Sequence, residues 1–259
     1  MMLLDIEIHW EFISIIYFGT LCIYNYDYVR SLHIDYNDNT KRVKHIQKYL
    51  SFRLLVLIIY GSIFFSFLIY FSNFQSIIFG TVLLLIGLLY TDVFKRGTKK
   101  FVGFKNIYTS LCFSMLLLFV PVYYSYKINM LFLVFFVFIL LQFIVDTSFC
   151  DLKDMYTDKK QDLKTLPLYF GKQKFLLFLH ILNAVSFLML SVAIATGVVP
   201  LFSLILLLFF LYRFYYINKA KESTGSDRNI QKLYAFVDGE YFFWPLVLSI
   251  GKYFMITLM

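Results

Sequence analysis

Charged residues are scarce in this chain. Asp, Glu, Lys and Arg make up only 15% of the 259 residues, whereas apolar residues make up 60% and aromatic residues 21%. A soluble domain carries about 25% charged residues, so this composition excludes an ordinary soluble protein. Apolar runs close to the roughly 20 residues that a helix needs to cross a bilayer recur along the sequence. The sequence therefore predicts a polytopic membrane protein.

Cysteine and histidine are also few, and neither is patterned. The three cysteines show no CxxC spacing, and the four histidines share no metal-ligand spacing. These absences argue against a disulfide framework and against a zinc site. We expect Cys22, Cys112 and Cys150 to be small apolar packing residues. Basic residues are missing from the N-terminal segment MMLLDIEIHW, so we expect it to lead into the first span rather than to act as a cleavable signal peptide.

Eight apolar runs predict eight transmembrane helices. We expect one integral-membrane domain over residues 1–259, built from α-helices alone. The predicted spans are residues 11–27, 52–71, 74–91, 106–125, 129–150, 173–195, 198–217 and 236–257.

Lysine and arginine lie in alternate loops between these spans. Of the 24 such residues, 22 lie in or beside the loops after the first, third, fifth and seventh spans, which hold six, five, six and five of them. Only Lys127 and Lys252 lie on the opposite side. By the positive-inside rule the four basic loops are cytoplasmic and both termini lie outside. The net charge of +8 therefore requires no nucleic-acid partner.

A run of acids follows the fifth predicted span. In the stretch DTSFCDLKDMYTDKKQDLKTLPLYFG, Asp151, Asp154, Asp158 and Asp162 are separated by three, four and four residues. Such spacing predicts one acidic helix face, which repels itself without a cation. Uncompensated charge at a bilayer boundary is costly. We therefore interpret this stretch as a functional site.

A second acidic face is predicted after the first span. Asp27, Ser31 and Asp35 are spaced four and four, with Asn25 and Asp38 close by. The donors are all oxygen atoms, which suit Mg²⁺ better than a softer metal. Mg²⁺ typically shares its coordination shell with substrate phosphates. The two acidic stretches together indicate a magnesium and phosphate site.

The later stretch resembles a motif of the UbiA superfamily of intramembrane aromatic prenyltransferases. Two Asp-rich motifs on the cytoplasmic side of that family hold Mg²⁺ and an isoprenyl diphosphate. Its second motif, DxxxDxxxGxKT, is matched here by Asp154, Asp158, Lys164 and Thr165. The sequence departs from the family at Asp162, where the motif has Gly, and the additional charge is expected to alter metal binding.

Two further segments carry the resemblance. The first family motif, NxxxDxxxD, is met in part, because Asp27 replaces the Asn, Ser31 replaces the central Asp and Asp35 is the last acid. Asp151 matches an acid common in the second motif. The segment of residues 87–111 is similar to the family's middle loop, with matches in residue type at Tyr90, Lys95, Lys105 and Asn106.

The resemblance implies an all-α helical bundle with a central cavity open to the cytoplasmic side. It implies a Mg²⁺-dependent enzyme that transfers an isoprenyl group from an isoprenyl diphosphate to a lipophilic acceptor within the bilayer. An aromatic acceptor is expected first, but families of this type use quinone-precursor rings, tetrapyrroles and glycerol phosphates, and the sequence does not choose among them. The implied catalytic residues are Asp27, Asp154 and Asp158. The implied substrate-binding residues are Asn25, Tyr90, Lys105, Asn106 and Lys164, and the implied metal ligands are Asp27, Asp35, Asp151, Asp154 and Asp158. The alternative is a protein of this fold without catalysis, or a transporter, that binds a prenyl lipid or a cation.

Other polar residues near the spans have simpler interpretations. Asp146, with Gln142 one turn earlier, either lines the cavity or forms an interhelical polar pair. Arg213 is expected to anchor the end of the seventh span, and Asp162, Lys159 and Lys160 are expected to form a solvated face.

Overall fold

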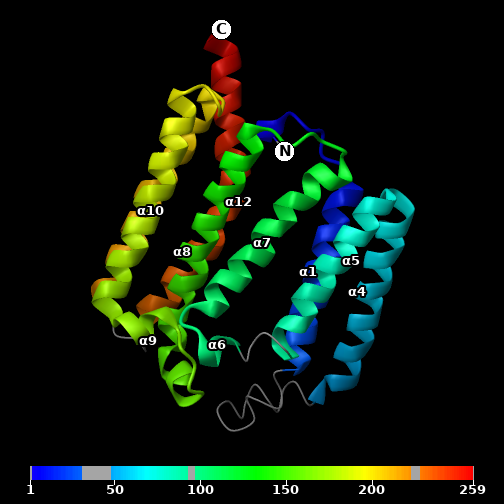
Figure 1. Ribbon diagram of the computed structural model, residues 1–259, viewed down its shortest axis with the longest axis vertical. Coiled ribbons are helices and arrows are strands. Elements are labelled where there is room, and N and C mark those ends of the chain that lie inside the picture. Colours follow the sequence, from blue (N-terminus) through cyan, green and yellow to red (C-terminus); the bar gives the residue numbers. More distant parts are fainter. Residues whose placement is uncertain (1, 31–47, 93–96, 223–227, 259) are drawn as a thin grey trace. The chain divides into compact units, whose positions relative to one another are not determined.

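The computed structural model describes residues 2–30, 48–92, 97–222 and 228–258. Every regular element in these ranges is a helix (Figure 1), so the all-α prediction is confirmed. The long helices are α1 (Trp10–Arg30), α4 (Leu50–Phe71), α5 (Phe74–Asp92), α7 (Phe104–Tyr123), α8 (Met130–Lys160), α10 (Lys172–Ala195), α11 (Leu208–Glu222) and α12 (Arg228–Leu258). The short ones are η1 (Met2–Leu4), α6 (Gly97–Lys100), α9 (Leu166–Phe170) and η3 (Leu201–Leu207).

Each predicted span overlaps a long helix, and several helices are suited to a bilayer. Within the described ranges, five helical stretches are long and apolar enough to cross a membrane: Leu50–Phe71, Phe104–Tyr123, Met130–Tyr156, Lys172–Ala195 and Leu201–Glu222. The apolar part of α5, Phe74–Tyr90, is shorter. The chain is therefore an integral, multi-pass membrane protein. The count of eight spans and the sidedness of the loops stay predictions from the sequence.

Three helices differ clearly from the predicted boundaries. Helix α12 begins at Arg228, eight residues before the predicted span of residues 236–257. Helix α8 continues to Lys160, well beyond the predicted end at residue 150. Its last ten residues, DLKDMYTDKK, contain neither Gly nor Pro, so nothing in the backbone ends the helix where the apolar run ends. The seventh span is divided into the 3₁₀ helix η3 and the α-helix α11, which meet at Leu207 and Leu208.

The chain divides into two compact units, which are described separately. The first comprises residues 1–7, 98–114 and 128–259. Its core has two apolar clusters, one around Val145 and Phe149 of α8 and the other around Phe138 of α8 and Trp244 of α12. The second unit comprises residues 8–97 and 115–127. The single domain expected for residues 1–259 stays a prediction.

In the second unit, α1 packs against both α4 and α5. Phe12 of α1 stacks on Phe119 of α7 with ring centroids 5.5 Å apart. A Cβ atom at Gly87 of α5 would lie only 2.3 Å from Ile23 Cδ1 of α1, so the glycine permits close approach of these two helices. This contact lies about one turn before Asp27 on α1 and before Tyr90 on α5.

Candidate functional site

Three acids of the second motif lie on one continuous helix. Asp151, Asp154 and Asp158 all belong to α8, at the three- and four-residue spacing that places them on one face. Asp151 and Asp158 are buried, with 1% and 5% of their surfaces exposed, and Asp154 is half-buried. The prediction of an acidic helical face is therefore confirmed for these three residues.

Asp151 is bound by two residues at the start of α7. Lys105 Nζ donates a hydrogen bond to its Oδ1 at 2.8 Å, and Asn106 Nδ2 donates one to its Oδ2 at 2.8 Å. Both Asp151 and Asn106 have only 1% of their surfaces exposed, whereas 32% of the Lys105 side chain is exposed. Two charge-assisted hydrogen bonds to one buried carboxylate hold the first turn of α7 against α8. The structure thus brings the predicted site residue Asp151 into contact with two others, Lys105 and Asn106, which lie about 45 positions earlier in the sequence.

Lys164 is held at the same end of α8 by its backbone. Its N–H donates to Thr98 O at 3.0 Å, and its carbonyl oxygen accepts from Gly103 N–H at 3.0 Å. The side chain is exposed, with Nζ 3.5 Å from Lys100 O. Gly103 has φ of +70°, and a Cβ there would lie 2.9 Å from Leu166 Cδ2. The segment between α6 and α7 therefore pairs closely with the end of the second motif.

Asp162 does not extend the acidic face, which corrects the predicted run of four acids. Helix α8 ends at Lys160, and Asp162 lies beyond it with φ of +55°. Leu163 N–H donates to Asp158 O at 3.0 Å and Asp162 N–H donates to Lys159 O at 3.3 Å. These two bonds form a Schellman motif, whose C′ residue adopts the left-handed conformation and is usually Gly. A Gly at this position would adopt the left-handed conformation without strain, and Asp tolerates it better than most residues.

The expectation of a solvated face is confirmed for three residues around this turn. Asp162, Lys159 and Lys160 are all exposed.

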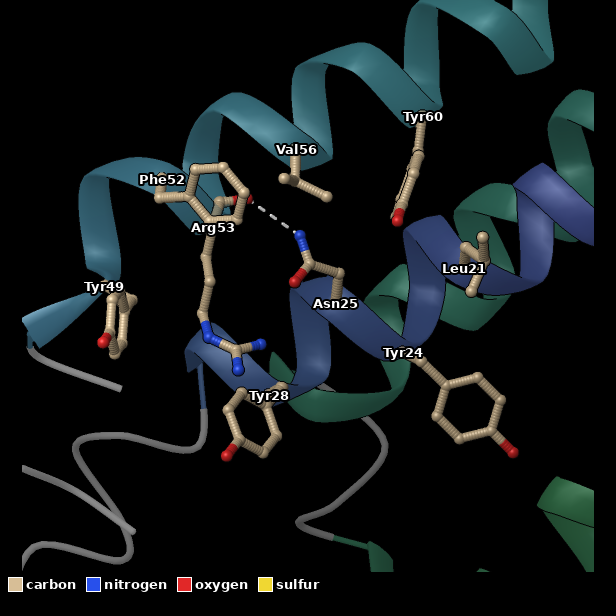
Figure 2. A pocket seen from close by; sticks show the side chains of 9 residues that line it. All are labelled: Leu21, Tyr24, Asn25, Tyr28, Tyr49, Phe52, Arg53, Val56 and Tyr60. Carbon is tan, nitrogen blue, oxygen red and sulfur yellow. Dashed lines mark hydrogen bonds between the residues drawn. The ribbon is translucent and has the colours of Figure 1, made fainter. Parts of the chain in front are cut away.

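The predicted residues Asn25, Asp27 and Tyr90 lie in the second unit. Asp27 is half-buried near the end of α1, and Tyr90 is half-buried near the end of α5. Asn25 Nδ2 donates to Arg53 O of α4 at 2.9 Å, so its amide joins two helices (Figure 2). Ser31, Asp35, Asp38 and Lys95 lie outside the described residues.

The main polar cluster that sequence reasoning missed surrounds Arg213 of α11. This residue is fully buried, and its Nη2 lies 2.9 Å from Asp146 Oδ2 of α8. Its Nε lies 3.0 and 2.9 Å from the two carboxylate oxygens of Glu240 on α12. Its Nη1 donates to Gln142 O at 3.1 Å. The expectation that Arg213 anchors the end of a span is wrong, because packing turns its guanidinium inward between two carboxylates.

Aromatic side chains complete this cluster. Tyr216 Oη donates to Asp146 Oδ1 at 3.0 Å, and Tyr241 Oη is also hydrogen-bonded to Asp146. Trp244 Nε1 donates to Glu240 Oε1 at 3.0 Å. Asp146 is thus an interhelical polar partner, one of the two alternatives left open by the sequence. Glu240 was not singled out, although an acid inside an apolar run was the signal that could have found it.

Gln142, the neighbour proposed for Asp146, contacts Arg213 through its backbone. Its side chain Nε2 donates instead to Ser186 Oγ of α10.

The second motif offers a donor set that fits a magnesium ion. Within residues 2–30, 48–92, 97–222 and 228–258, no group of three or more His, Cys, Asp or Glu residues is placed to hold a metal ion. Mg²⁺ needs no such cage, because it is usually held by one or two carboxylates together with substrate phosphates and water. Two buried polar atoms near the motif, Asn106 Oδ1 and Thr165 Oγ1, have no hydrogen-bond partner among the described residues. Such atoms suit a polar ligand.

Comparison with known proteins gives one family. The sequence matches the family model of the UbiA prenyltransferase family over residues 11–244. No curated protein matches the chain significantly.

Solved structures of low sequence identity share the fold. A UbiA homologue from Aeropyrum pernix K1 superposes with a TM-score of 0.69 at 12% identity, covering 99% of this chain and 93% of that chain. A UbiA homologue from Archaeoglobus fulgidus, bound to DMAPP and Mg²⁺, gives a TM-score of 0.64 at 13% identity, covering 93% and 85% of the two chains. A structure from a study of digeranylgeranylglyceryl phosphate synthase gives 0.60 at 16% identity, covering 96% and 88%. The fold and the family match confirm the predicted resemblance, and the chain belongs to the UbiA prenyltransferase family.

Proposed function

We propose that this protein is a Mg²⁺-dependent intramembrane prenyltransferase. It transfers an isoprenyl group from an isoprenyl diphosphate to a lipophilic, aromatic acceptor. The observation that carries the proposal is the end of α8, where Asp154 and Asp158 follow the Asp151 carboxylate held by Lys105 and Asn106. The solved homologue with DMAPP and Mg²⁺, and a second structure with GPP and Mg²⁺, support this choice of substrate and metal.

Asp154 and Asp158 are proposed to hold the magnesium diphosphate, with Asp151 as a further acid of the metal site. Mg²⁺, when bound, stabilises the negative charge that develops on the diphosphate as the allylic C1–O bond ionises. The two acids are one helical turn apart, so a rigid helix sets the spacing of their carboxylates. Asp158 is 5% exposed, and its burial strengthens its electrostatic interaction with a bound cation.

Lys105 and Lys164 are proposed to contact the diphosphate as positive charges. Lys105 is positioned by its 2.8 Å contact with Asp151 and keeps 32% of its side chain exposed. Lys164 is positioned by backbone hydrogen bonds on both sides of its Cα while its side chain stays exposed. Asn106 binds the second oxygen of Asp151 through its Nδ2, and it is proposed to contact the substrate through its Oδ1, which has no partner among the described residues. Both lysine side chains are thus at least partly exposed on a fixed backbone.

For the first motif the roles stay predictions from the resemblance. Asp27 is proposed as a catalytic acid and metal ligand and Asp35 as a metal ligand. Asn25 and Tyr90 are proposed to bind substrate. The basic loops are proposed to be cytoplasmic, with both termini outside.

The test is binding of geranylgeranyl diphosphate to the detergent-purified protein, with and without Mg²⁺. We expect Mg²⁺-dependent binding in the wild type and its loss in the double variant Asp154→Ala, Asp158→Ala. Asp162→Asn is the matched control, because it removes an exposed acid four residues away and keeps a side chain that tolerates positive φ. This control should bind like the wild type, because Asp162 is exposed and lies beyond the end of α8, off the acidic face. A change in its Mg²⁺-dependent binding would instead support the altered metal binding expected from the family motif.

The binding result separates enzyme from non-catalytic alternative in two steps. If isoprenyl diphosphates of several chain lengths, including geranylgeranyl diphosphate, all failed to bind in a Mg²⁺-dependent way, the diphosphate site would be refuted. Binding without product for any acceptor, whether an aromatic ring or a glycerol phosphate, would instead favour a protein that binds prenyl lipids. Prenylated product that requires Asp154 and Asp158 would establish the transferase.

A further inference from the structure

A pocket of about 650 Å³ lies between the end of α1 and the beginning of α4, within the second unit. Figure 2 shows that aromatic side chains of both helices form most of its wall. Among the residues that the structure describes, Arg53 is the only charged one that lines it. The pocket thus combines one cation with a largely aromatic and aliphatic surface.

Arg53 has no acidic partner among the described residues. Its guanidinium carbon lies 4.1 Å from the centroid of the Tyr28 ring, and Figure 2 shows the two groups side by side. Its Nε is buried and makes no hydrogen bond within the described part of the chain. A guanidinium offers five donors in a planar fork that matches phosphate geometry. Stacking on Tyr28 orients this fork through the face of the guanidinium, and an anion could accept a hydrogen bond from Nε, which has no partner in the described ranges.

The pocket is polar at one end and apolar at the other. Arg53 lies in the first turn of α4, while Val56 and Tyr60 follow one and two turns further along the same helix. On α1, Leu21 lies about two turns before Tyr28. The walls therefore extend about 10 Å along the helices from the cationic end. Because α4 is a candidate span, this direction runs from the membrane interface into the bilayer.

The rim of the pocket is suited to lipid. Tyr24, Tyr49 and Phe52 have 59%, 41% and 62% of their surfaces exposed. Tyrosine is enriched at the membrane interface, where its ring meets both acyl chain and headgroup. Lys48 lies beside this rim, with Nζ 5.4 Å from the centroid of the Tyr49 ring. An arginine and a lysine at the interface attract an anionic headgroup.

We propose that this pocket binds one anionic phospholipid of the surrounding membrane. The Arg53 guanidinium binds the lipid phosphate, and an acyl chain lies along Leu21, Val56 and Tyr60. The lipid would thereby be held by the α1–α4 pair. Asn25, proposed above to bind substrate, also lines this pocket, so the experiment must distinguish a membrane lipid from the isoprenyl diphosphate. The proposal does not depend on whether the protein transfers prenyl groups.

Native mass spectrometry of the full chain in detergent, titrated with phosphatidylglycerol or phosphatidylcholine, tests the proposal. Arg53→Gln should weaken phosphatidylglycerol binding about tenfold or more, the effect of losing a charged hydrogen bond. Tyr28→Leu, which leaves the net charge unchanged, should weaken it about two- to fivefold by removing the stack. Lys99→Gln removes an exposed charge of α6 outside the pocket and should change nothing. Phosphatidylcholine has the same phosphate but a cationic choline, so the wild type should bind it more weakly than phosphatidylglycerol, and Arg53→Gln should reduce its binding by a smaller factor.

Several outcomes would overturn this assignment. Equal losses in Arg53→Gln and Lys99→Gln would show unspecific attraction between charges, and no loss in Arg53→Gln would remove the phosphate contact. Displacement of the lipid by inorganic phosphate would mean that the pocket binds free phosphate instead. Loss of Mg²⁺-dependent geranylgeranyl diphosphate binding in Arg53→Gln would assign the pocket to the substrate. The double variant Asp154→Ala, Asp158→Ala changes no residue of the pocket, so its effect on diphosphate binding tests the proposed function and not the lipid site.

Discussion

Replacing Arg213 by Met should strongly destabilise the first unit. The wild-type guanidinium is fully buried and lies within 3.0 Å of carboxylate oxygens of both Asp146 and Glu240. The variant leaves these two acids buried, with no positive partner, between α8, α11 and α12. Removal of one partner from a buried ion pair costs about 3–5 kcal/mol, and we expect a loss of unfolding free energy in this range.

The same cluster predicts a rescue. The triple variant Arg213→Met, Asp146→Asn, Glu240→Gln removes the cation and both carboxylates while keeping acceptors for Tyr216 Oη and Trp244 Nε1. Replacing all members of a buried charged cluster by neutral residues of similar size is often close to neutral. We therefore expect the triple variant to recover most of the stability lost in the single variant.

Reversible unfolding in mixed detergent micelles measures both effects. It is followed by circular dichroism and by the fluorescence of Trp244 in a Trp10→Phe background, because Trp10 lies in the second unit. Lys219→Met is the control on the same helix, because Lys219 pairs with Glu222 at an exposed position. It should unfold like the wild type. A triple variant no more stable than Arg213→Met would refute the reasoning, as would a single variant less than about 1 kcal/mol below the wild type.

Three further predictions concern the end of α8. Asp162→Gly should raise the unfolding free energy by up to about 1 kcal/mol, because Gly adopts the observed φ of +55° without steric cost; an unchanged or lower midpoint in thermal unfolding would contradict this. Asn106→Leu should lower the unfolding free energy by about 1–3 kcal/mol, because one buried oxygen of Asp151 loses its donor. It should also weaken Mg²⁺-dependent diphosphate binding. Unfolding in detergent measures the first effect, and the geranylgeranyl diphosphate binding assay measures the second. A single cysteine introduced at the exposed position Lys159 should react with a membrane-impermeant maleimide in permeabilised cells but not in intact cells, because the loop is predicted to be cytoplasmic. Labelling in intact cells would show that the loop lies outside, opposite to the prediction.

The sequence alone determined the class of the molecule and the location of its main motif. Apolar runs decide which segments form helices in a bilayer, since backbone polar groups must be satisfied within each helix. The spacing of Asp151, Asp154 and Asp158 is likewise a local property, so helical geometry places them on one face whatever their neighbours are. Both features are read within windows of about 20 residues or fewer.

Only the tertiary structure decided which polar groups meet. Lys105 and Asn106 reach Asp151 across about 45 positions, and Arg213 joins Asp146 and Glu240 from separations of 67 and 27 residues. These pairings depend on how each helix is rotated about its axis, which is set by the packing of side chains such as Phe149. The turn at Asp162 also required the structure, because a run of acids at helical spacing does not show where the helix ends. Local spacing thus predicts faces, whereas packing between helices decides partners.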